Sequence, residues 1–427
     1  MKKVIDWKKI SVWLLLVYTY LIWLRTIIIP HESFITPALL MLVLLFVLFE
    51  SKGTLLIGRK ELKTQANTWI LIFIYICINN KHFVSNLLNH GMIQYFVMIA
   101  FMLLLENTSK WTETWVVWTK RYAILHAFAT VFFYLNKSVY PIFANKAFDG
   151  KELSGVMKQF NSGWMPGICK NVSANGMVLS ICFLVFAESF IYKKEKKPYE
   201  WGAMAFILFA FLLTGKRGPL LFIIISMAFV YLVQQKDRQA IIRFIKLGIA
   251  GVVLWMAFLF SAKYIPAVES IILKNEELSN GASGGLLHGR LSLWTYAIDM
   301  FKQSPIIGNG YWSYAAYAEE NDAITTSAHN FYLQVLTELG IIGLVMYIVA
   351  FVSGIVICIK KIRTKCDFQT KTIVSIALSI QVFTILYGMS SSSLIYYYIL
   401  IPYFLSCSAV RSLCFCNDKQ NNESEVS

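Results

Sequence analysis

Long apolar stretches separated by short polar ones dominate the chain between residues 10 and 412. Many of them approach the ~20 residues that an α-helix needs to cross the hydrocarbon core of a bilayer. They lie at 10–29, 34–50, 67–79, 91–106, 121–136, 174–192, 199–214, 219–235, 242–264, 331–359, 371–388 and 393–412. The pattern therefore predicts an all-α, polytopic membrane protein of about twelve transmembrane helices.

Composition supports this class of protein. Of the 427 residues, 57% are hydrophobic and only 15% are charged, and the mean hydropathy is +0.58. A soluble multidomain protein of this length would be far more polar.

Basic residues follow the predicted spans and fall mainly on one side of the membrane. They cluster at 2–9, 52–63, 110–121, 193–197, 236–246, 360–371 and 411–419. That side has 26 Lys and Arg against 13 Asp and Glu, whereas the other side has 12 against 11. Because basic residues concentrate in cytoplasmic loops, we expect both termini in the cytoplasm. The net charge of +15 thus reflects topology, and nucleic acid is excluded as a partner.

The ends of the chain fit a single transmembrane domain. The first apolar stretch follows a basic start, but no small-residue cleavage site precedes Arg25, so we interpret it as a retained helix. The eight cysteines include no C-x-x-C pair, which argues against a zinc site or a disulfide framework. We expect residues 1–416 to form the domain and the polar residues 417–427 to form a disordered cytoplasmic tail.

Two predicted extracytoplasmic segments are long enough to do more than connect helices: about 137–172, which is rich in glycine, and the larger 265–330. Backbone polar groups at the membrane must be paired or face water, so we expect both segments to fold over a cavity that opens outward between the helices. Any active site should lie there.

The larger segment contains a predicted amphipathic helix. It opens at Gly289 and Arg290, has apolar residues at Leu291, Trp294, Ala297, Ile298 and Phe301, and ends at Ser304-Pro305. Arg290 would then lie in the first turn, where free N–H groups and the helix dipole attract anions such as phosphate. An arginine that only anchors an interfacial helix is the alternative.

The turn Gly215-Lys216-Arg217-Gly218-Pro219 lies in a tight hairpin on the predicted outer side, where basic residues are disfavoured. Glycine lets a backbone approach a ligand closely, and a guanidinium can hold two phosphate oxygens at once. Lys216 and Arg217 are therefore candidate phosphate ligands, with an interfacial anchor as the alternative.

His329 stands where the polar segment meets the next hydrophobic helix, and Ser327 or Asn330 can cap that helix. An imidazole is largely neutral near pH 7 and can accept a proton, so His329 is a candidate general base; a capping or packing histidine is the alternative. Glu338 would lie about 13 Å deeper along the helix, where an acid is usually paired and often functional.

Together these motifs resemble the O-antigen ligase and polymerase superfamily. The resemblance rests on His329-Asn330, on Gly289-Arg290 through Trp294, on Ser304-Pro305 to Gly308-Asn309-Gly310, and on Thr214 to Gly218. It covers chiefly residues 170–345. Lys216 departs from relatives that often have serine at this position.

The resemblance implies a membrane glycosyltransferase fold of the C type and a lipid-diphosphate-linked glycan as donor. Arg217 and Arg290 would hold the diphosphate, Lys216 could add a contact, His329 would lie by the reacting hydroxyl, and Glu338 could orient the site. It implies polymerisation of undecaprenyl-diphosphate-linked repeat units at the outer face of the bacterial cytoplasmic membrane. A ligase using the same donor is one alternative, and a flippase or secondary transporter is another.

We expect neither cofactor nor metal. Two arginines can stabilise the charge that develops on the leaving phosphate, and we interpret Glu276, Glu277, Glu319, Glu320 and Asp322 as solvated loop charges rather than cation ligands. The expected partners are lipid-linked oligosaccharide donor and acceptor, membrane lipid, and flippase and chain-length regulator proteins.

Overall fold

The structure is a computed structural model, and it describes residues 45, 60–80, 92–104, 110–192, 196–216, 218–235, 242, 286–320, 327–364, 366–392 and 397–425. All regular structure within these ranges is helical, without a strand. The helices are α3 (Lys60–Ile78), α5 (Met92–Leu104), α6 (Lys110–Leu135), α7 (Val139–Ala147), α8 (Gly150–Asn161), α9 (Val172–Ile191), α10 (Pro198–Leu212), α11 (Gly218–Gln234), α14 (Leu286–Gln303), α15 (Ser313–Glu320), α16 (Phe331–Arg363), α17 (Phe368–Tyr387) and α18 (Tyr397–Glu425). The all-α prediction is confirmed.

Helices occupy nine of the twelve predicted spans, namely α3, α5, α6, α9, α10, α11, α16, α17 and α18. The predicted spans 10–29 and 34–50 and most of 242–264 lie outside the described residues. Among those described, α9, α16 and α17 are long and apolar enough to cross a membrane by themselves. The count of twelve stays a prediction. Helix α18 continues to Glu425, through most of the tail that the sequence predicts to be disordered.

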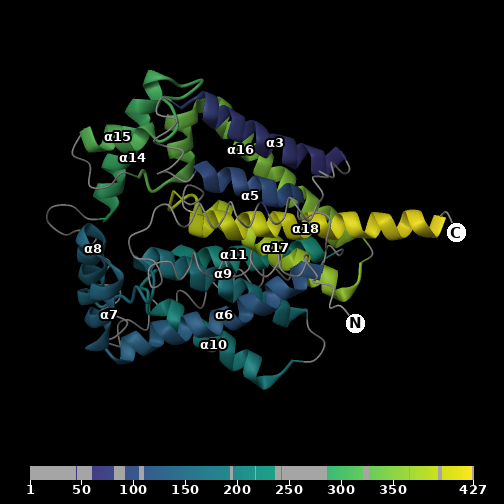
Figure 1. Cartoon of the computed structure of the whole chain (residues 1–427), viewed down its shortest axis with the longest axis horizontal. Coiled ribbons are helices and arrows are strands. Elements are labelled where there is room, and N and C mark those ends of the chain that lie inside the picture. The colour runs from purple at the N-terminus through teal and green to yellow at the C-terminus, as the bar shows by residue number, and fades with distance from the viewer. Residues whose placement is uncertain are drawn as a thin grey trace.

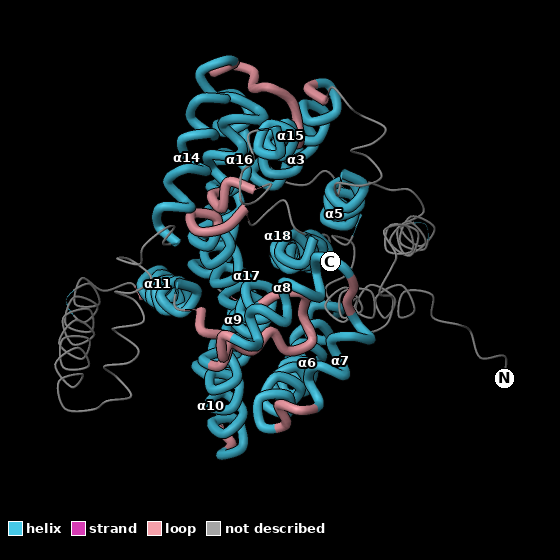
Figure 2. Tube along the Cα trace, turned by 90° about the vertical axis from the view of Figure 1, so that its left-hand side faces the viewer, coloured by secondary structure: helices cyan, strands magenta, loops and turns pink. Residues whose placement is uncertain are grey.

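The bundle is built around α9, α17 and α18, which lie at the centre of the end-on view in Figure 2. Helices α6 and α10 pack on one side of α9, while α3, α5 and α16 pack on the other side of the molecule, against α18 and α17. Trp69 of α3 joins these elements, because its indole contacts Tyr347, Phe351, Tyr403 and Phe404 with ring centroids 4.7 to 6.1 Å apart. Aromatic packing of this kind adds to simple burial.

Four short or amphipathic helices, α7, α8, α14 and α15, lie at one end of the bundle, opposite the C-terminal end of α18 (Figure 1). They come from the two segments, 137–172 and 265–330, that the sequence predicts to share one side of the membrane. Phe133 of α6, Tyr140 and Ala144 of α7, and Val156 of α8 form a small separate core there.

Helix α16 is broken at Gly340, whose φ of 65° and ψ of −168° are not helical. The turn 305–310 binds the backbone groups that the break leaves free. The N–H groups of Asn309 and Gly310 donate to the carbonyls of Thr337 and Glu338 at 3.0 and 2.9 Å. On the other side of the break, the N–H groups of Ile341 and Ile342 donate to Pro305 and Ile306 at 2.9 and 3.2 Å. The turn thus pairs backbone groups on both sides of the break, as an interruption in an apolar helix requires.

The break separates two different parts of α16. The second part carries an exposed apolar row at helical spacing, formed by Ile341, Ile342, Val345, Ile348, Val349, Val352 and Val356. This part is about 34 Å long at 1.5 Å per residue, enough to cross a hydrocarbon core of about 30 Å. In the first part, residues 331–339, no side chain is exposed. The first part is therefore covered by protein, and the second part carries an exposed apolar row of the kind expected to face lipid, which we call the lipid-facing row.

Candidate functional site

The hairpin between α10 and α11 holds Lys216 close to α9. The hydroxyl of Thr214 donates to the carbonyl of Phe211 at 2.7 Å and accepts the Lys216 N–H at 3.3 Å. A Cβ on Gly176 of α9 would lie 3.2 Å from Thr214 Oγ1 and 3.4 Å from Lys216 Cβ. The small residue in α9 thus lets the lysine lie against this helix. Arg217, the neighbouring candidate, lies outside the described residues.

The segment 162–171 supports the hairpin. The Met165 N–H donates to the carbonyl of Leu213 at 2.9 Å, and the carbonyl of Met165 accepts Nδ2 of Asn175 at 3.0 Å. Asn175 is fully buried, with its Oδ1 2.8 Å from His126 Nε2, and His126 Nδ1 lies 2.9 Å from the hydroxyl of Tyr122. A buried polar cluster shared by α6 and α9 therefore fixes the hairpin that carries Lys216.

Helix α14 positions Arg290. The helix packs through Leu293, Ala297 and Met300, which are buried, and the indole N–H of Trp294 donates to the carbonyl of Ala328 at 3.2 Å. The same helix is thereby tied to the residue that precedes His329.

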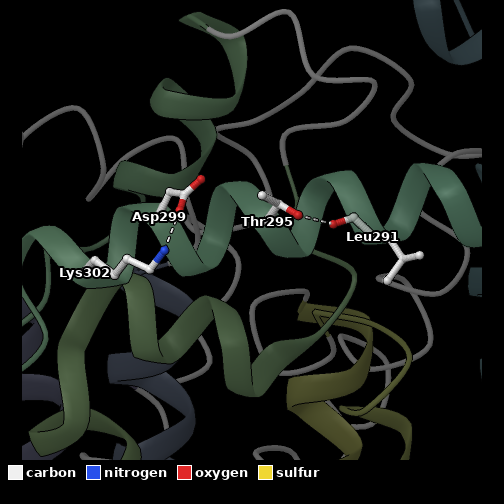
Figure 3. Close-up of polar contacts among 4 residues, drawn as sticks. All are labelled: Leu291, Thr295, Asp299 and Lys302. Atoms are coloured by element: carbon white, nitrogen blue, oxygen red, sulfur yellow. Dashed lines mark hydrogen bonds and ion pairs between the residues drawn. The ribbon is translucent and has the colours of Figure 1, made fainter.

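One sequence prediction about α14 was wrong. The helix begins at Leu286, so Arg290 lies in the second turn rather than the first. Leu291 and Ile298 are exposed, whereas Leu293 and Met300 are buried against neighbouring elements. Along the outer face, Thr295 donates to the carbonyl of Leu291 at 2.9 Å, and Lys302 forms an ion pair with Asp299 at 3.0 Å (Figure 3).

His329 has a φ of 48°, in the left-handed region that residues other than glycine seldom adopt. Its N–H donates to Ser327 Oγ at 3.3 Å. Asn330 caps α16, since its Oδ1 accepts the N–H groups of Tyr332 and Leu333 at 3.0 and 3.2 Å. No hydrogen bond to the ring of His329 occurs within the described residues.

The structure brings together three of the basic candidates, Lys216, Arg290 and His329, which we name the cation cluster. Burial lowers the pKa of the Lys216 ammonium, and nearby Arg290 lowers it further. Burial also lowers the pKa of the His329 imidazole, with Arg290 and Lys216 acting in the same direction. Within the described part of the chain, no carboxylate forms an ion pair with a member of this cluster. The cluster therefore has an excess of positive charge that an anion can neutralise.

Glu338 does not join the cation cluster. Its Oε1 accepts Nε2 of Gln334 at 3.0 Å, and the backbones of Trp312 and Tyr314 also hydrogen-bond its carboxyl group. The break at Gly340 follows Glu338, and the exposed apolar row of α16 begins only at Ile341. The depth of Glu338 in the membrane stays a prediction. Glu338 belongs to the protein-covered first part of α16.

Sequence reasoning missed Gln334 and Ser392, which connect Glu338 to the loop of His329. Ser392 donates to Gln334 Oε1 at 2.7 Å, and Ser327 Oγ lies 2.6 Å from Ser392 Oγ. One signal was present: Gln334, Thr337 and Glu338 are polar residues spaced three and four apart in an otherwise apolar stretch, which predicts one polar helix face.

No group of three or more metal-binding side chains occurs among the described residues. Of the acidic residues weighed as cation ligands, Glu276, Glu277 and Asp322 lie outside the described residues, and the side chains of Glu319 and Glu320 are not described.

Comparison with known proteins agrees with these motifs. Residues 202–348 match the sequence profile of the O-antigen ligase family, and this segment includes Lys216, Arg217, Arg290, His329 and Glu338. The chain is also similar to an uncharacterized protein of Haemophilus influenzae, with 26% identity over 227 residues, or 49% of this chain and 56% of that protein. The similarity thus spans about half of each protein. The profile match supports the resemblance seen in the sequence: over residues 202–348, this helical membrane protein is similar to the O-antigen ligase family.

Proposed function

We propose that this protein is a glycosyltransferase that polymerises undecaprenyl-diphosphate-linked oligosaccharide repeat units for a surface polysaccharide. The observation that carries the proposal is the cation cluster, which joins three basic side chains from separate segments at one end of the bundle. All three lie within the segment that matches the O-antigen ligase family. A site of this kind suits a diphosphate.

The chemistry follows from the charges. The bond between the anomeric carbon of the donor glycan and a phosphate oxygen breaks, and the acceptor hydroxyl oxygen bonds to that carbon. Negative charge then develops on the leaving undecaprenyl diphosphate, where Arg290 and Lys216, with Arg217 beside them in the sequence, stabilise it electrostatically. These cations supply the stabilisation without a metal ion.

His329 takes the proton that the acceptor hydroxyl releases. Its ring is without a hydrogen-bond partner among the described residues, and the surrounding positive charge favours the neutral, proton-accepting form. A base that acts in the transition state contributes roughly 10²- to 10⁴-fold to the rate. Glu338 acts at a distance, by orienting the first part of α16.

Charge asymmetry in the sequence supports the orientation that we propose. The end of the bundle with α7, α8, α14 and α15 faces outward, and both termini face the cytoplasm. The remaining expected partners, a flippase that delivers the repeat units and a regulator of chain length, belong to the same proposal, as does a membrane-embedded glycosyltransferase fold of the C type.

A ligase is the second candidate, because the matching family is described as O-antigen ligase. A ligase uses the same donor chemistry but transfers the finished glycan to a different acceptor. The residues of the cation cluster do not indicate which acceptor the enzyme uses.

Deleting the gene and analysing the lipid-linked glycans that accumulate separates the candidates. Single repeat units on the outer leaflet indicate a polymerase, and full-length chains indicate a ligase. A pool confined to the inner leaflet would contradict both and indicate transport. A plasmid with the His329→Gln variant, at matched protein level, should leave the same lipid-linked glycans as the deletion.

A further inference from the structure

A continuous chain of hydrogen bonds connects Glu338 with the loop that contains His329. It passes from the carboxyl group of Glu338 to Gln334 at 3.0 Å, to Ser392 at 2.7 Å and to Ser327 at 2.6 Å, and it ends at the N–H of His329, 3.3 Å from Ser327. All four side chains are buried, with exposed fractions of 5% or less. Ser392 follows α17, so the chain crosses from one helix to another.

The direction of each hydrogen bond is determined. The amide oxygen of Gln334 only accepts, so the single hydroxyl hydrogen of Ser392 points to it. Ser327 must then donate its own hydrogen to Ser392, which leaves lone pairs of Ser327 Oγ to accept the N–H of His329. Removing one hydroxyl interrupts the whole chain, because no other member can supply the missing hydrogen.

This loop needs such a restraint. The left-handed backbone of His329 is unfavourable for a residue with a side chain, and conformations of this kind persist only where the surroundings impose them. Trp294 holds the carbonyl of Ala328, and Asn330 is fixed as the helix cap. The hydrogen bonds of Ser327 provide the remaining restraint, on the N–H of His329 itself.

We propose that Ser327, Ser392 and Gln334 are positioning residues that fix the backbone of His329, and through it the imidazole, relative to the cation cluster. The inference rests on the proposed function, in which His329 is the base. Fixing a base to a fraction of an ångström affects the rate of the chemical step, because small misplacements are costly. It does not affect how tightly Arg290 and Lys216 hold the donor.

The test measures kcat and KM on purified full-length protein, with lipid-linked glycans extracted from the deletion strain as substrate. Ser392→Ala should lower kcat about 10- to 100-fold and change KM for the donor less than about 2-fold. Ser392→Thr, which keeps a hydroxyl, should recover most of the rate. Ser390→Ala is the matched control in the same loop, because the Ser390 hydroxyl donates to the carbonyl of Tyr387, outside the chain.

The decisive measurement repeats Ser392→Ala in the His329→Gln background. If Ser392 acts through His329, Ser392→Ala should lower kcat less than about 2-fold once the imidazole is gone. If Ser392 is only structural, Ser392→Ala should lower kcat by the same factor in both backgrounds. Equal losses overturn the positioning role even if His329→Gln is impaired as proposed. A His329→Gln protein close to wild type overturns the base assignment and the positioning role together. If Ser392→Ala does not fold, Ser327→Ala tests the last connection in the same way.

Discussion

Gly308 and Gly340 adopt left-handed backbones with φ of 81° and 65°, and each lies against the backbone of the other's segment. A Cβ on Gly308 would overlap the carbonyl of Glu338 and the nitrogen of Gly340, and a Cβ on Gly340 would overlap the carbonyl of Ile306. The two glycines allow the turn 305–310 to reach the backbone groups of the broken helix.

We expect Gly308→Ala and Gly340→Ala to destabilise the folded protein by at least ~2–3 kcal/mol, since each adds strain at positive φ and a clash with backbone. Thermal unfolding in detergent measures the loss. Gly202→Ala in α10 is the matched control, because its Cβ would meet no atom within 4 Å, and a helical alanine should be neutral or stabilising. Unchanged thermal stability of both variants would contradict the proposed role of the close contact.

Arg290 and Lys216 should determine the affinity for undecaprenyl diphosphate. We expect Arg290→Ala to weaken binding about 10- to 100-fold and Arg290→Lys to recover only part of it, because lysine lacks the planar fork that holds two oxygens. The measurement is binding of undecaprenyl diphosphate to purified protein at two ionic strengths, where higher salt should weaken it.

Lys302→Ala is the control for that measurement, because Lys302 lies on the same helix, is exposed and pairs with Asp299 (Figure 3). Equal losses for the Arg290 and Lys302 variants would mean that the surface attracts anions without a specific site.

The pH dependence of the reaction should reflect the protonation of His329. Its neutral ring is the active form, and burial with Arg290 and Lys216 holds its pKa below the usual 6.5. We therefore expect kcat/KM to persist as the pH falls to 6.5 and to drop only below it. Arg290→Gln removes one positive neighbour, so the pKa of His329 rises and the drop moves to higher pH.

The negative charge of bound diphosphate should also raise the pKa of His329. Because kcat reports the substrate-bound enzyme and kcat/KM the free enzyme, the drop in kcat should occur at higher pH than the drop in kcat/KM. Lys302→Gln should leave both profiles unchanged. A profile that does not move in Arg290→Gln, or that moves to lower pH, would contradict the electrostatic coupling within the cation cluster.

The topology can be tested at exposed positions of the described helices. Lys158→Cys in α8 and Gln303→Cys in α14 should react with a membrane-impermeant thiol reagent in intact cells, and Lys197→Cys before α10 should react only after the cells are opened. These positions are exposed in the structure, so accessibility reports the side of the membrane. Reaction of Lys197→Cys in intact cells, with protection of the other two, would reverse the proposed orientation.

The sequence predicted the basic residues Lys216, Arg290 and His329 on one side of the membrane, and in the structure they lie near one another. Arg217, predicted beside them, lies outside the described residues. Lys216 and His329 each stand at an end of an apolar stretch, and charge asymmetry assigns those ends to one side of the membrane with Arg290. Hydropathy and charge asymmetry together thus bring three distant positions to one end of the bundle. It does so because bilayer thickness limits where the ends of each helix can lie.

The break at Gly340 could not be predicted in this way, because residues 331–359 form one predominantly apolar stretch of helical length. The hydrogen bonds that make the break possible come from residues about thirty positions earlier. The helix propensities of residues near Gly340 do not reveal such a long-range pairing. The start of α14 differed from the predicted start at Gly289 and Arg290 for a similar reason. Gly289 would end a helix by local preference, but the helix continues through it to Leu286.

The lipid-facing row of α16 begins only at Ile341, so the first part of the helix, with His329 just ahead of it, lies beyond the part that the bilayer surrounds. Under the proposed function, the glycan reacts while the tail of its carrier remains in the membrane. Both substrates would then reach the enzyme by lateral diffusion, and the released carrier would stay in the leaflet for reuse. Turnover would depend on the number of carrier lipids per unit of membrane area rather than on a concentration in solution.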